Sequence, residues 1–362
     1  MADRIVEGAR LPARIKVVGV GGGGCNAVRR MMARQIPGIE YIVVNTDIKS
    51  LDSISGALSV QIGNYLTHGF GAGGDPRVGE RAAEEGSITL RRMVKDAELV
   101  FITAGMGGGT GTGAAPVVAQ IAKSSGALTI GVVTTPFSFE GKRRLEMAMA
   151  GVRRLKVCVD NIIVVHNDRL LQFADHNAAI REAFATADEV VTEGILSVSQ
   201  LVNIPGEINV DLADVKSVMG IPGTALMAIG TGEGQHPASE AAQEAIANPL
   251  LDISMRGAKG VLFSFAGGPD LTLEAVNESA SLICQEADPK ALIFFGMMSP
   301  TEELRGKVRL TLIATGIKSP MNNGSGEGLF SGIGQALGSI GSGRDGKGTA
   351  WGDQVLKSRQ LR

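Results

Sequence analysis

Short, predominantly apolar runs recur along the first half of the chain, each followed by a glycine-rich or polar segment and then by a helical pattern. The runs at residues 14–20, 41–44, 99–102, 128–133 and 161–165 show no regular alternation of apolar and polar positions. Runs of this length without alternation are typical of parallel strands that are buried on both faces of a sheet. The alternation of strands with helices predicts an α/β fold with a Rossmann-like parallel sheet.

The longest helical pattern covers residues 178–202. Apolar side chains recur there at steps of three and four residues, at Ile180, Phe184, Ala187, Val191, Ile195, Val198 and Val202. At about 1.5 Å per residue this helix would be roughly 37 Å long, and Pro205 and Gly206 end it. A helix of this length can span one domain and connect it to a second.

A smaller region of mixed pattern follows the long helix. Strands are predicted at residues 224–229, 260–265, 291–297 and 307–314, and helices at 238–247 and 271–287. We therefore expect a smaller, mixed α+β C-terminal domain. Met297, Met298 and the phenylalanines beside them are assigned to its core, because large apolar side chains are usually buried.

The segment 105–113 lies between a predicted strand and a predicted helix, and six of its nine residues are glycine. Glycine lets a ligand approach the main chain, and the free N–H groups at a helix start attract phosphate. A tight turn needs only one or two glycines, so this segment predicts a phosphate-binding loop. No Lys-Ser/Thr pair follows its last glycine, which excludes a Walker A motif. Backbone amides, threonine hydroxyls and a metal ion must then hold the phosphates.

Two further glycine clusters also precede helices. Gly19, Gly21 and Gly24 fit the G-x-G-x-x-G pattern of dinucleotide sites, and Asp47 ends the next predicted strand, where an acid could bind a ribose hydroxyl. An NAD-dependent dehydrogenase would explain these residues but leaves the segment 105–113 without a use. The cluster at 69–76 is equally compatible with a surface turn when taken alone. Three such clusters together favour one polyphosphate nucleotide bound from several sides.

Two acidic features remain open at this level. Asp211 and Asp214 are three residues apart at a predicted helix start, so they project on one side. They can cap the helix, or they can hold a cation or orient water. Asp188, on the long helix, is by position alone a solvated acid.

Composition narrows the class of protein. The 37 acidic and 35 basic residues nearly balance, which implies no basic face for nucleic acid. The three cysteines are far apart and show neither metal-site spacing nor a disulfide framework. We find no signal peptide and no apolar run long enough to span a bilayer. These features lead us to expect a cytoplasmic protein.

Together, these loops resemble those of the tubulin/FtsZ family. The segment 107–113 has the sequence of the family's signature loop, and other family loops match in order at residues 21–26, 45–47, 71–74, 136–144, 167–168 and 209–214. The resemblance covers about residues 12–316. It implies a tubulin/FtsZ-type fold and GTP or GDP, with Mg²⁺, rather than NAD.

The resemblance also assigns roles by position. The residues matched to phosphate contacts are Gly22, Gly23, Gly24, Cys25, Asn26, Gly107, Gly108, Gly109, Thr110 and Gly111. Ala72 and Gly73 would lie by the γ-phosphate, and Glu140 would accept from the ribose hydroxyls with Arg144 beside it. Pro136 and Asp47 belong to matched nucleotide loops. Asn167 and Asp188 would bind the guanine edge, whose N1–H and N2–H₂ groups suit a carboxylate, and Phe184 would stack on the base.

In the family, the loop with Asn209, Asp211 and Asp214 enters the nucleotide site of the next subunit. The resemblance thus implies a GTPase that polymerises head to tail, forms the cytokinetic ring in the cytoplasm and contacts membrane only through adaptors. Slow turnover is expected because neither a P-loop lysine nor an arginine finger is evident. The alternative is a tubulin-like paralogue with a cell-shape or regulatory role and weak GTPase activity. Retention of these three residues argues against lost catalysis.

The chain divides accordingly into a flexible segment at 1–12, a GTP-binding domain at 13–177, a central helix at 178–203, a catalytic loop with its following helix at 204–219, a C-terminal domain at 220–316 and a tail at 317–362. The tail is rich in Gly and Ser without apolar periodicity, which predicts disorder. Its end lacks the acidic-Pro-aromatic-Leu peptide with which the family binds membrane adaptors. The adaptor therefore stays unidentified.

Overall fold

A computed structural model of the chain describes residues 13–170, 180–247 and 254–317. The segment at 1–12 and the tail from 318, for which flexibility and disorder are predicted, lie outside the described residues. Within the described residues, no helix is both long enough and apolar enough to cross a membrane.

The first domain is built on a six-stranded sheet in the order β3-β2-β1-β4-β5-β6, with every neighbouring pair parallel. Its strands are β1 (Ile15–Val20), β2 (Ile39–Asn45), β3 (Leu58–Gln61), β4 (Leu99–Gly105), β5 (Leu128–Thr135) and β6 (Asn161–His166). This is the strand order of a doubly wound nucleotide-binding sheet, in which ligands bind beyond the carboxyl ends of the strands. The parallel α/β prediction is confirmed.

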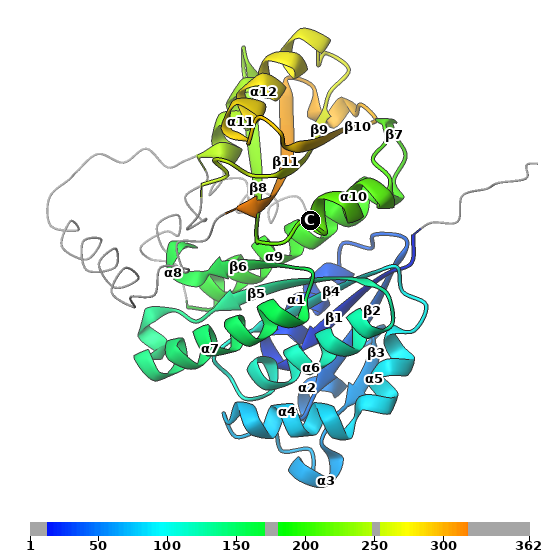
Figure 1. Cartoon of the computed structure of the whole chain (residues 1–362), viewed down its shortest axis with the longest axis vertical. Helices are drawn as coiled ribbons and strands as arrows, with labels where there is room; N and C mark the ends of the chain where they lie inside the picture. Colours follow the sequence, from blue (N-terminus) through cyan, green and yellow to red (C-terminus); the bar gives the residue numbers. More distant parts are fainter. Residues whose placement is uncertain (1–12, 171–179, 248–253, 318–362) are drawn as a thin grey trace, which may run out of the picture.

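Helices cover both faces of this sheet (Figure 1). One face packs on α1 (Gly21–Met32), α2 (Ile48–Asp52) and α9 (Ile180–Asn203). The other packs on α4 (Pro76–Glu85), α5 (Ser87–Val94), α6 (Thr110–Ser124) and α7 (Lys142–Cys158). The short helices are α3 (Asn64–Thr67), α8 (Asn167–Leu170) and the 3₁₀ turn η1 (Ser138–Glu140). Because helices cover both faces of the sheet, the strand sequences are predominantly apolar, with polar exceptions such as Lys16 and Glu40.

The second domain has a five-stranded mixed sheet in the order β7-β10-β9-β11-β8. Its elements are β7 (Gly206–Ile208), α10 (Leu212–Met219), β8 (Thr224–Glu233), α11 (Pro237–Ile246), β9 (Gly260–Gly267), α12 (Leu273–Glu286), β10 (Leu292–Met298), the 3₁₀ turn η2 (Glu302–Leu304) and β11 (Lys307–Ile317). Helices α11 and α12 share a buried core with β8, β9 and β11. The predicted mixed α+β architecture is confirmed, whereas the predicted domain boundaries stay a prediction.

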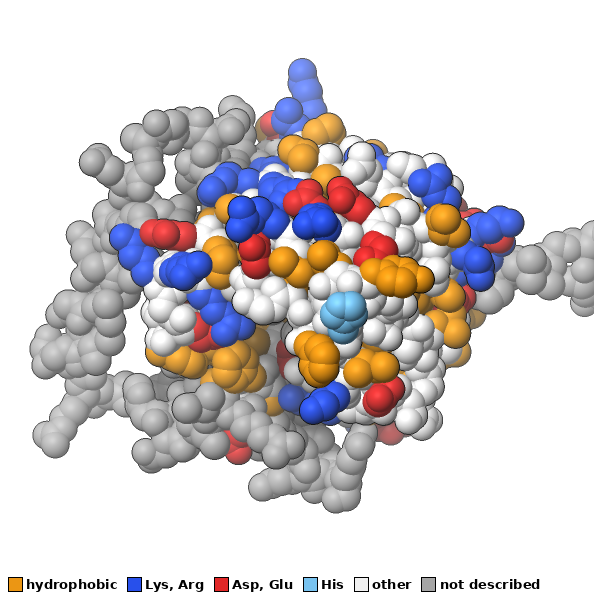
Figure 2. Space-filling model, turned by 90° about the horizontal axis from the view of Figure 1, so that it is seen from below, with side chains coloured by type: hydrophobic (Ala, Val, Ile, Leu, Met, Phe, Trp, Pro, Cys, Tyr) orange, Lys and Arg blue, Asp and Glu red, His pale blue; other side chains and the backbone are white. Residues whose placement is uncertain are grey.

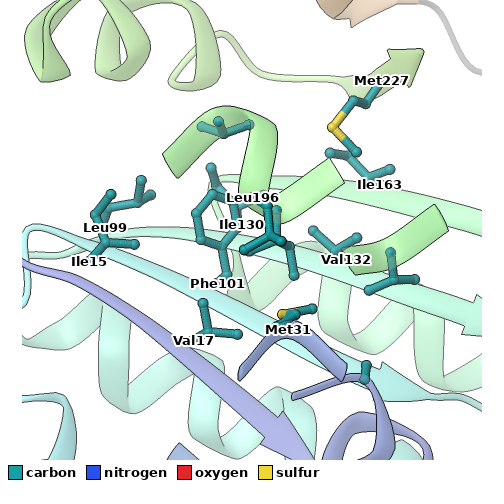
Figure 3. Close-up of a cluster of buried hydrophobic side chains, with 14 of the residues drawn as sticks. Ile15, Val17, Met31, Leu99, Phe101, Ile130, Val132, Ile163, Leu196 and Met227 are labelled. Atoms are coloured by element: carbon teal, nitrogen blue, oxygen red, sulfur yellow. The ribbon is translucent and has the colours of Figure 1, made fainter. Parts of the chain in front are cut away.

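Helix α9 lies between the two sheets and belongs to one continuous core with both. Figure 3 shows Leu196 of α9 close to Phe101 and Ile130 of the first sheet. Met227 of β8 reaches the same core, and its side chain approaches Gly194 so closely that a Cβ there would overlap it. The predicted long helix at 178–202 is therefore a structural link between the domains.

One prediction for the second domain is wrong in part. Phe294 packs against the core, but Phe295 is 41% exposed and Met297 and Met298 are only half-buried. Strand β10 lies between β9 and the three-residue β7, so little covers its outer side. Phe295 stacks instead on Phe263 of β9, with ring centroids 6.0 Å apart.

Candidate nucleotide site

Two glycine loops lie side by side at the carboxyl ends of β1 and β4, because these strands are neighbours in register. Gly21 begins α1 with φ of 70°, and a Cβ on it would lie 2.7 Å from the backbone nitrogen of Gly111. Gly24 is held as closely, since a Cβ there would lie 2.2 Å from the carbonyl oxygen of Thr103. The first turns of α1 and α6 therefore start next to one another, and their free N–H groups serve one location.

Two more loops pack against the segment 105–113. Gly107, with φ of 97°, sits against Arg144 and Pro136, where a Cβ would come 2.7 Å from the Arg144 carbonyl oxygen. A Cβ on Gly109 would come 2.8 Å from that of Ala72. The predicted phosphate segments, the 71–74 loop and the 136–144 loop thus meet at one end of the sheet.

Open space remains in front of this loop cluster. A Cβ atom on Gly22, Gly73 or Gly108 would meet nothing within 4 Å among the residues that the structure describes. Gly22 and Gly108 also have φ outside the left-handed region, so their backbone conformation does not require glycine. Glycine at these two positions leaves room for a ligand to approach the main chain, as phosphate oxygens would. Among the remaining matched residues, Gly23 and Asn26 are exposed, and Cys25 is a buried thiol whose pKa burial raises to about 12.

Thr46 joins the end of β2 to this cluster and was not assigned a role from the sequence. Its hydroxyl lies 2.7 Å from that of Thr110, at the start of α6. Its carbonyl oxygen accepts from the Thr67 hydroxyl at 3.4 Å. Both threonine side chains of the hydroxyl pair are buried, so each hydroxyl needs the other as a partner.

Asp47 is engaged in the local backbone. One carboxylate oxygen accepts from the Lys49 N–H at 3.1 Å and caps α2, and the other accepts from the Ser50 hydroxyl at 2.7 Å. Asp47 also forms a backbone bridge with Phe70, which ties β2 to the 71–74 loop. The geometry thus gives Asp47 a capping role. Strand β2, which Asp47 follows, lies toward the other edge of the sheet from β6.

Asn167 and Asp188 lie at the β6 side of the loop cluster. Asn167 follows β6 and is buried, and its Oδ1 has no hydrogen-bond partner among the described residues. A buried amide oxygen normally has a donor, and a bound ligand could supply one here. The Asp188 carboxylate is 18% exposed and pairs with Arg30 of α1 at 3.1 Å. The interpretation of Asp188 as a solvated acid is therefore wrong.

Aromatic and charged side chains from 136–144 complete this end. Phe184 of α9, 37% exposed, packs edge-on against Phe137, with centroids 5.1 Å apart, and Phe139 lies beside both. Glu140 accepts from the Phe137 N–H at 2.9 Å and pairs with Arg144 at 2.8 Å. Phe184 therefore keeps a partly open ring surface, whereas Glu140 is already held in place by two partners.

The acidic loop lies elsewhere in the chain. Asp211 and Asp214 form a capping box at the start of α10: each carboxylate accepts from the backbone N–H of the other residue, at 2.9 and 3.0 Å. The Asn209 side chain accepts from the Gly206 N–H at 2.7 Å. The capping interpretation is confirmed. From Asp188 to the end of α9 at Asn203 the helix rises about 22 Å, so the structure does not bring these acids to the nucleotide loops of their own chain.

The hydrogen-bond donors and acceptors at these loops fit a guanine nucleotide. The glycine loops offer backbone N–H groups to phosphates, and Asp188 and the Asn167 oxygen offer acceptors to a base with two adjacent donors. The described residues contain no group of three or more His, Cys, Asp or Glu side chains that could hold a metal.

Comparison with known proteins agrees with this geometry. The Tubulin/FtsZ family, GTPase domain, matches residues 14–175, and the FtsZ family, C-terminal domain, matches residues 223–318. The FtsZ dimer of M. jannaschii is 42% identical with a TM-score of 0.80, over 85% of this chain and 89% of that chain. A point mutant of FtsZ from M. jannaschii is also 42% identical, with a TM-score of 0.79, over 84% of this chain and 92% of that chain.

CetZ2 from Haloferax volcanii, solved as a GTPgS-bound protofilament, shares the fold with a TM-score of 0.74 at 21% identity, over 90% of this chain and 98% of that chain. The matches to both domains, together with 42% identity over most of the chain, show the family. Membership implies a GTPase domain that binds guanine nucleotide. The chain therefore belongs to the tubulin/FtsZ family of GTPases and, through its second domain, to the FtsZ family.

Proposed function

We propose that the protein hydrolyses GTP in a site shared between two subunits and polymerises head to tail. The observation that carries the proposal is the position of Asp211 and Asp214, which follow the far end of α9 from Phe184 and Asp188. A chain whose acids cannot reach its own nucleotide can donate them to a neighbour. Repetition of this contact does not close, so it generates a filament.

Hydrolysis needs a water molecule placed in line with the γ-phosphate. The water oxygen bonds to the γ-phosphorus while the bond from that phosphorus to the β–γ bridging oxygen breaks, which releases GDP and phosphate. The N–H groups of the loops at Gly22 and Gly108 would stabilise the charge on the phosphate oxygens. Asp211 and Asp214 of the next subunit would orient the water and accept its proton. Mg²⁺, when bound with the nucleotide, neutralises charge on the β- and γ-phosphates.

Exposed apolar side chains at the two ends support the head-to-tail contact. At the nucleotide end, Tyr65 of α3 and Phe70 of the third glycine cluster are 86% and 89% exposed. Figure 2 looks onto the end of the molecule that carries α3 and shows hydrophobic side chains grouped among charges of both signs. Beside the acidic loop, Ile208 of β7 and Phe295 of β10 are 40% and 41% exposed. Contiguous exposed apolar patches are typical of interaction surfaces, and we propose that these side chains contribute to one at each end.

The proposal extends to the cellular role: a filament in the cytoplasm that forms the ring at the division site, with adaptors of the division machinery as partners, no nucleic acid, and membrane contact only through those adaptors. It rests on the 42% identity to proteins described as FtsZ. The alternative is a tubulin-like paralogue that shapes cells or regulates division with weak turnover. A GTP-bound chain that assembles but hydrolyses GTP at no concentration would favour this alternative.

The first test is the rate of GTP hydrolysis per subunit as a function of protein concentration. We expect a threshold concentration, below which hydrolysis is negligible. The double variant Asp211→Asn, Asp214→Asn keeps the helix cap, since asparagine also accepts backbone N–H groups, but loses both charges. It should bind GTP normally and hydrolyse it at least roughly a hundredfold more slowly. A rate per subunit that is independent of concentration would overturn the shared site.

A mixing experiment tests donation of the acids directly. The first partner is the double variant above, and the second is Asp188→Asn, which should bind XTP in place of GTP and keeps its acidic loop. In a mixture supplied with both nucleotides, GTP can be hydrolysed only where the acids of the XTP-bound subunit reach the GTP of the other. Recovery of GTP hydrolysis supports the shared site, and its absence in mixtures that still form filaments contradicts it.

A further inference from the structure

A row of ion pairs joins α1, which begins with the first glycine loop, to α9, which carries Asp188. The Arg30 Nε donates to Asp188 Oδ2 at 3.1 Å. One turn further along α1, Arg34 pairs with Glu189 and, at 3.1 Å, with Glu193. The two helices pack closely at this point and share buried apolar side chains. None of these three ion pairs was indicated by the sequence patterns.

The surroundings of Asp188 disfavour its ionised form. On balance the surroundings raise the pKa of Asp188 to about 6; burial is the largest cause, and the neighbouring Glu189 acts in the same direction. Arg30 and Arg29, both on α1, lower it. Arg30 is the one of the two that contacts the carboxylate, because the Arg29 guanidinium donates instead to the Asn26 side chain at 3.2 Å. Without Arg30 the carboxyl group would be protonated at a still higher pH.

Guanine binding requires the charged form. The guanine edge presents N1–H and N2–H₂ as adjacent donors, and an ionised carboxylate accepts on both oxygens, whereas a protonated one presents an O–H donor itself. The contact with Arg30 uses one lone pair of Oδ2 and leaves a second lone pair on that atom and all of Oδ1. The Arg30 contact also fixes the rotation of the carboxylate about its χ2 bond.

We propose that Arg30 is a positioning residue that keeps Asp188 ionised and oriented, and that it thereby determines the preference of the site for guanine. This inference rests on the proposed function, since it assumes that Asp188 faces the base. If Arg30 has this role, recognition of the base depends on a side chain of α1, the helix that begins with the first glycine loop.

The test compares equilibrium affinities for GTP and ITP between pH 5.5 and pH 8. ITP lacks the 2-amino group, so the ratio of the two affinities isolates one of the two contacts with the carboxylate. Arg30→Met keeps the length of the side chain and removes its charge. Arg34→Met is the matched control, because it makes the same change one turn along the same helix and removes ion pairs to Glu189 and Glu193 only.

The direction of the pH effect follows from the proton balance. Asp188 must lose its proton to accept both guanine donors, so GTP affinity falls as the pH drops through the pKa of Asp188. Removing an opposite charge in contact with a carboxylate raises its pKa by about one unit or more. Arg30→Met should therefore move the midpoint of this fall upward by about one pH unit. At pH 6.5 this lowers the ionised fraction of Asp188 from about three quarters to about one quarter, so the GTP:ITP ratio should fall about threefold.

The outcomes separate the inference from the proposed function. If Arg30→Lys restores most of the ratio and Arg34→Met leaves ratio and midpoint unchanged, the inference holds. If Arg30→Met folds, as judged by circular dichroism and thermal unfolding, and shows the wild-type ratio and midpoint, Arg30 has a merely structural role and the inference is wrong. If the wild-type protein itself shows no preference for GTP over ITP, the assignment of Asp188 to the base fails, and the proposed function must be revised first.

Discussion

The hydroxyl groups of Thr46 and Thr110 lie 2.7 Å apart in a buried contact that joins the end of β2 to the first residue of α6. Through its carbonyl oxygen, Thr46 also receives a hydrogen bond from the hydroxyl of Thr67, just before the third glycine cluster. One residue thus connects the glycine-rich loop at 105–113, proposed to bind phosphate, with the loop proposed to lie by the γ-phosphate.

Replacing Thr46 by valine should loosen both loops. The substitution keeps the shape of the side chain but leaves the Thr110 hydroxyl buried without its partner, which costs about 1–3 kcal/mol. We expect thermal unfolding at a lower temperature and GTP binding weakened by about tenfold, measured by calorimetry. Thr46→Ser should retain most of both. Thr129→Val, a fully buried threonine at the other end of the sheet, is the control and should leave GTP affinity unchanged.

Gly108→Ala separates a loop that binds phosphate from a loop that is merely a tight turn. A Cβ on Gly108 meets nothing within 4 Å and its φ is not left-handed, so the nucleotide-free protein should unfold within about 0.5 kcal/mol of wild type. GTP affinity should fall at least tenfold, because the methyl group occupies the approach of the phosphates. Unchanged GTP affinity would show that the phosphates lie elsewhere.

Asp188→Asn should exchange the base preference. An asparagine amide offers one donor and one acceptor, which matches the edge of xanthine, where a carbonyl replaces the 2-amino group. GTP affinity should drop by about 2–3 kcal/mol and XTP affinity should rise, in competition measurements against a fluorescent nucleotide. Loss of affinity for both nucleotides in a folded variant would place Asp188 outside the base contact.

Asp188→Asn should also change how the free energy of unfolding depends on pH. Burial raises the pKa of Asp188 above its value in the unfolded chain, so this carboxyl group favours folding while it is protonated, and that contribution is lost as the pH rises through about 6. Asp188→Asn removes this dependence. In unfolding by denaturant without nucleotide, we expect the variant to gain stability relative to wild type as the pH is raised from 5 to 8.

Phe70→Ser tests the contact between subunits. The side chain is 89% exposed and packs on little in its own chain, so the variant should fold and bind GTP as wild type does. Loss of an aromatic anchor at an interface costs about 2 kcal/mol or more, so the concentration needed for assembly should rise at least tenfold in sedimentation assays. Val157→Ser, at a similarly exposed site on α7, should assemble normally. Equal behaviour of the two variants would remove Phe70 from the interface.

Much of the fold could be predicted from patterns that are visible in the sequence. Strands β1, β4, β5 and β6 are predominantly apolar because both faces of the sheet are covered, and the glycine loops stand out by composition. The short edge strands β3 and β7 were missed, since each has three or four residues and only Val60 of them is buried. Local pattern carries little information at that length.

The contacts between distant segments could not be predicted from one sequence. Nothing in the periodicity of α1 and α9 says that Arg30 faces Asp188, and nothing in Asn45-Thr46-Asp47 says that the hydroxyl of Thr46 meets that of Thr110. Such pairs depend on the rotation of one helix against another and on strand order. The exposure of Phe295 was likewise not predicted, because it depends on how much of β10 the other described elements cover.

The distance that α9 places between Asp188 and Asp211 has a consequence for any row of such subunits. At one end of the row, the last molecule displays a nucleotide that no acidic loop reaches, and at the other end the last molecule displays a loop with no nucleotide to act on. In the filament proposed above, the nucleotide at the first end would remain GTP until another subunit is added there, whereas the GTP at every interior site would be hydrolysed over time. The proposed filament is therefore polar both in its structure and in the state of its bound nucleotide, although all its subunits have the same sequence.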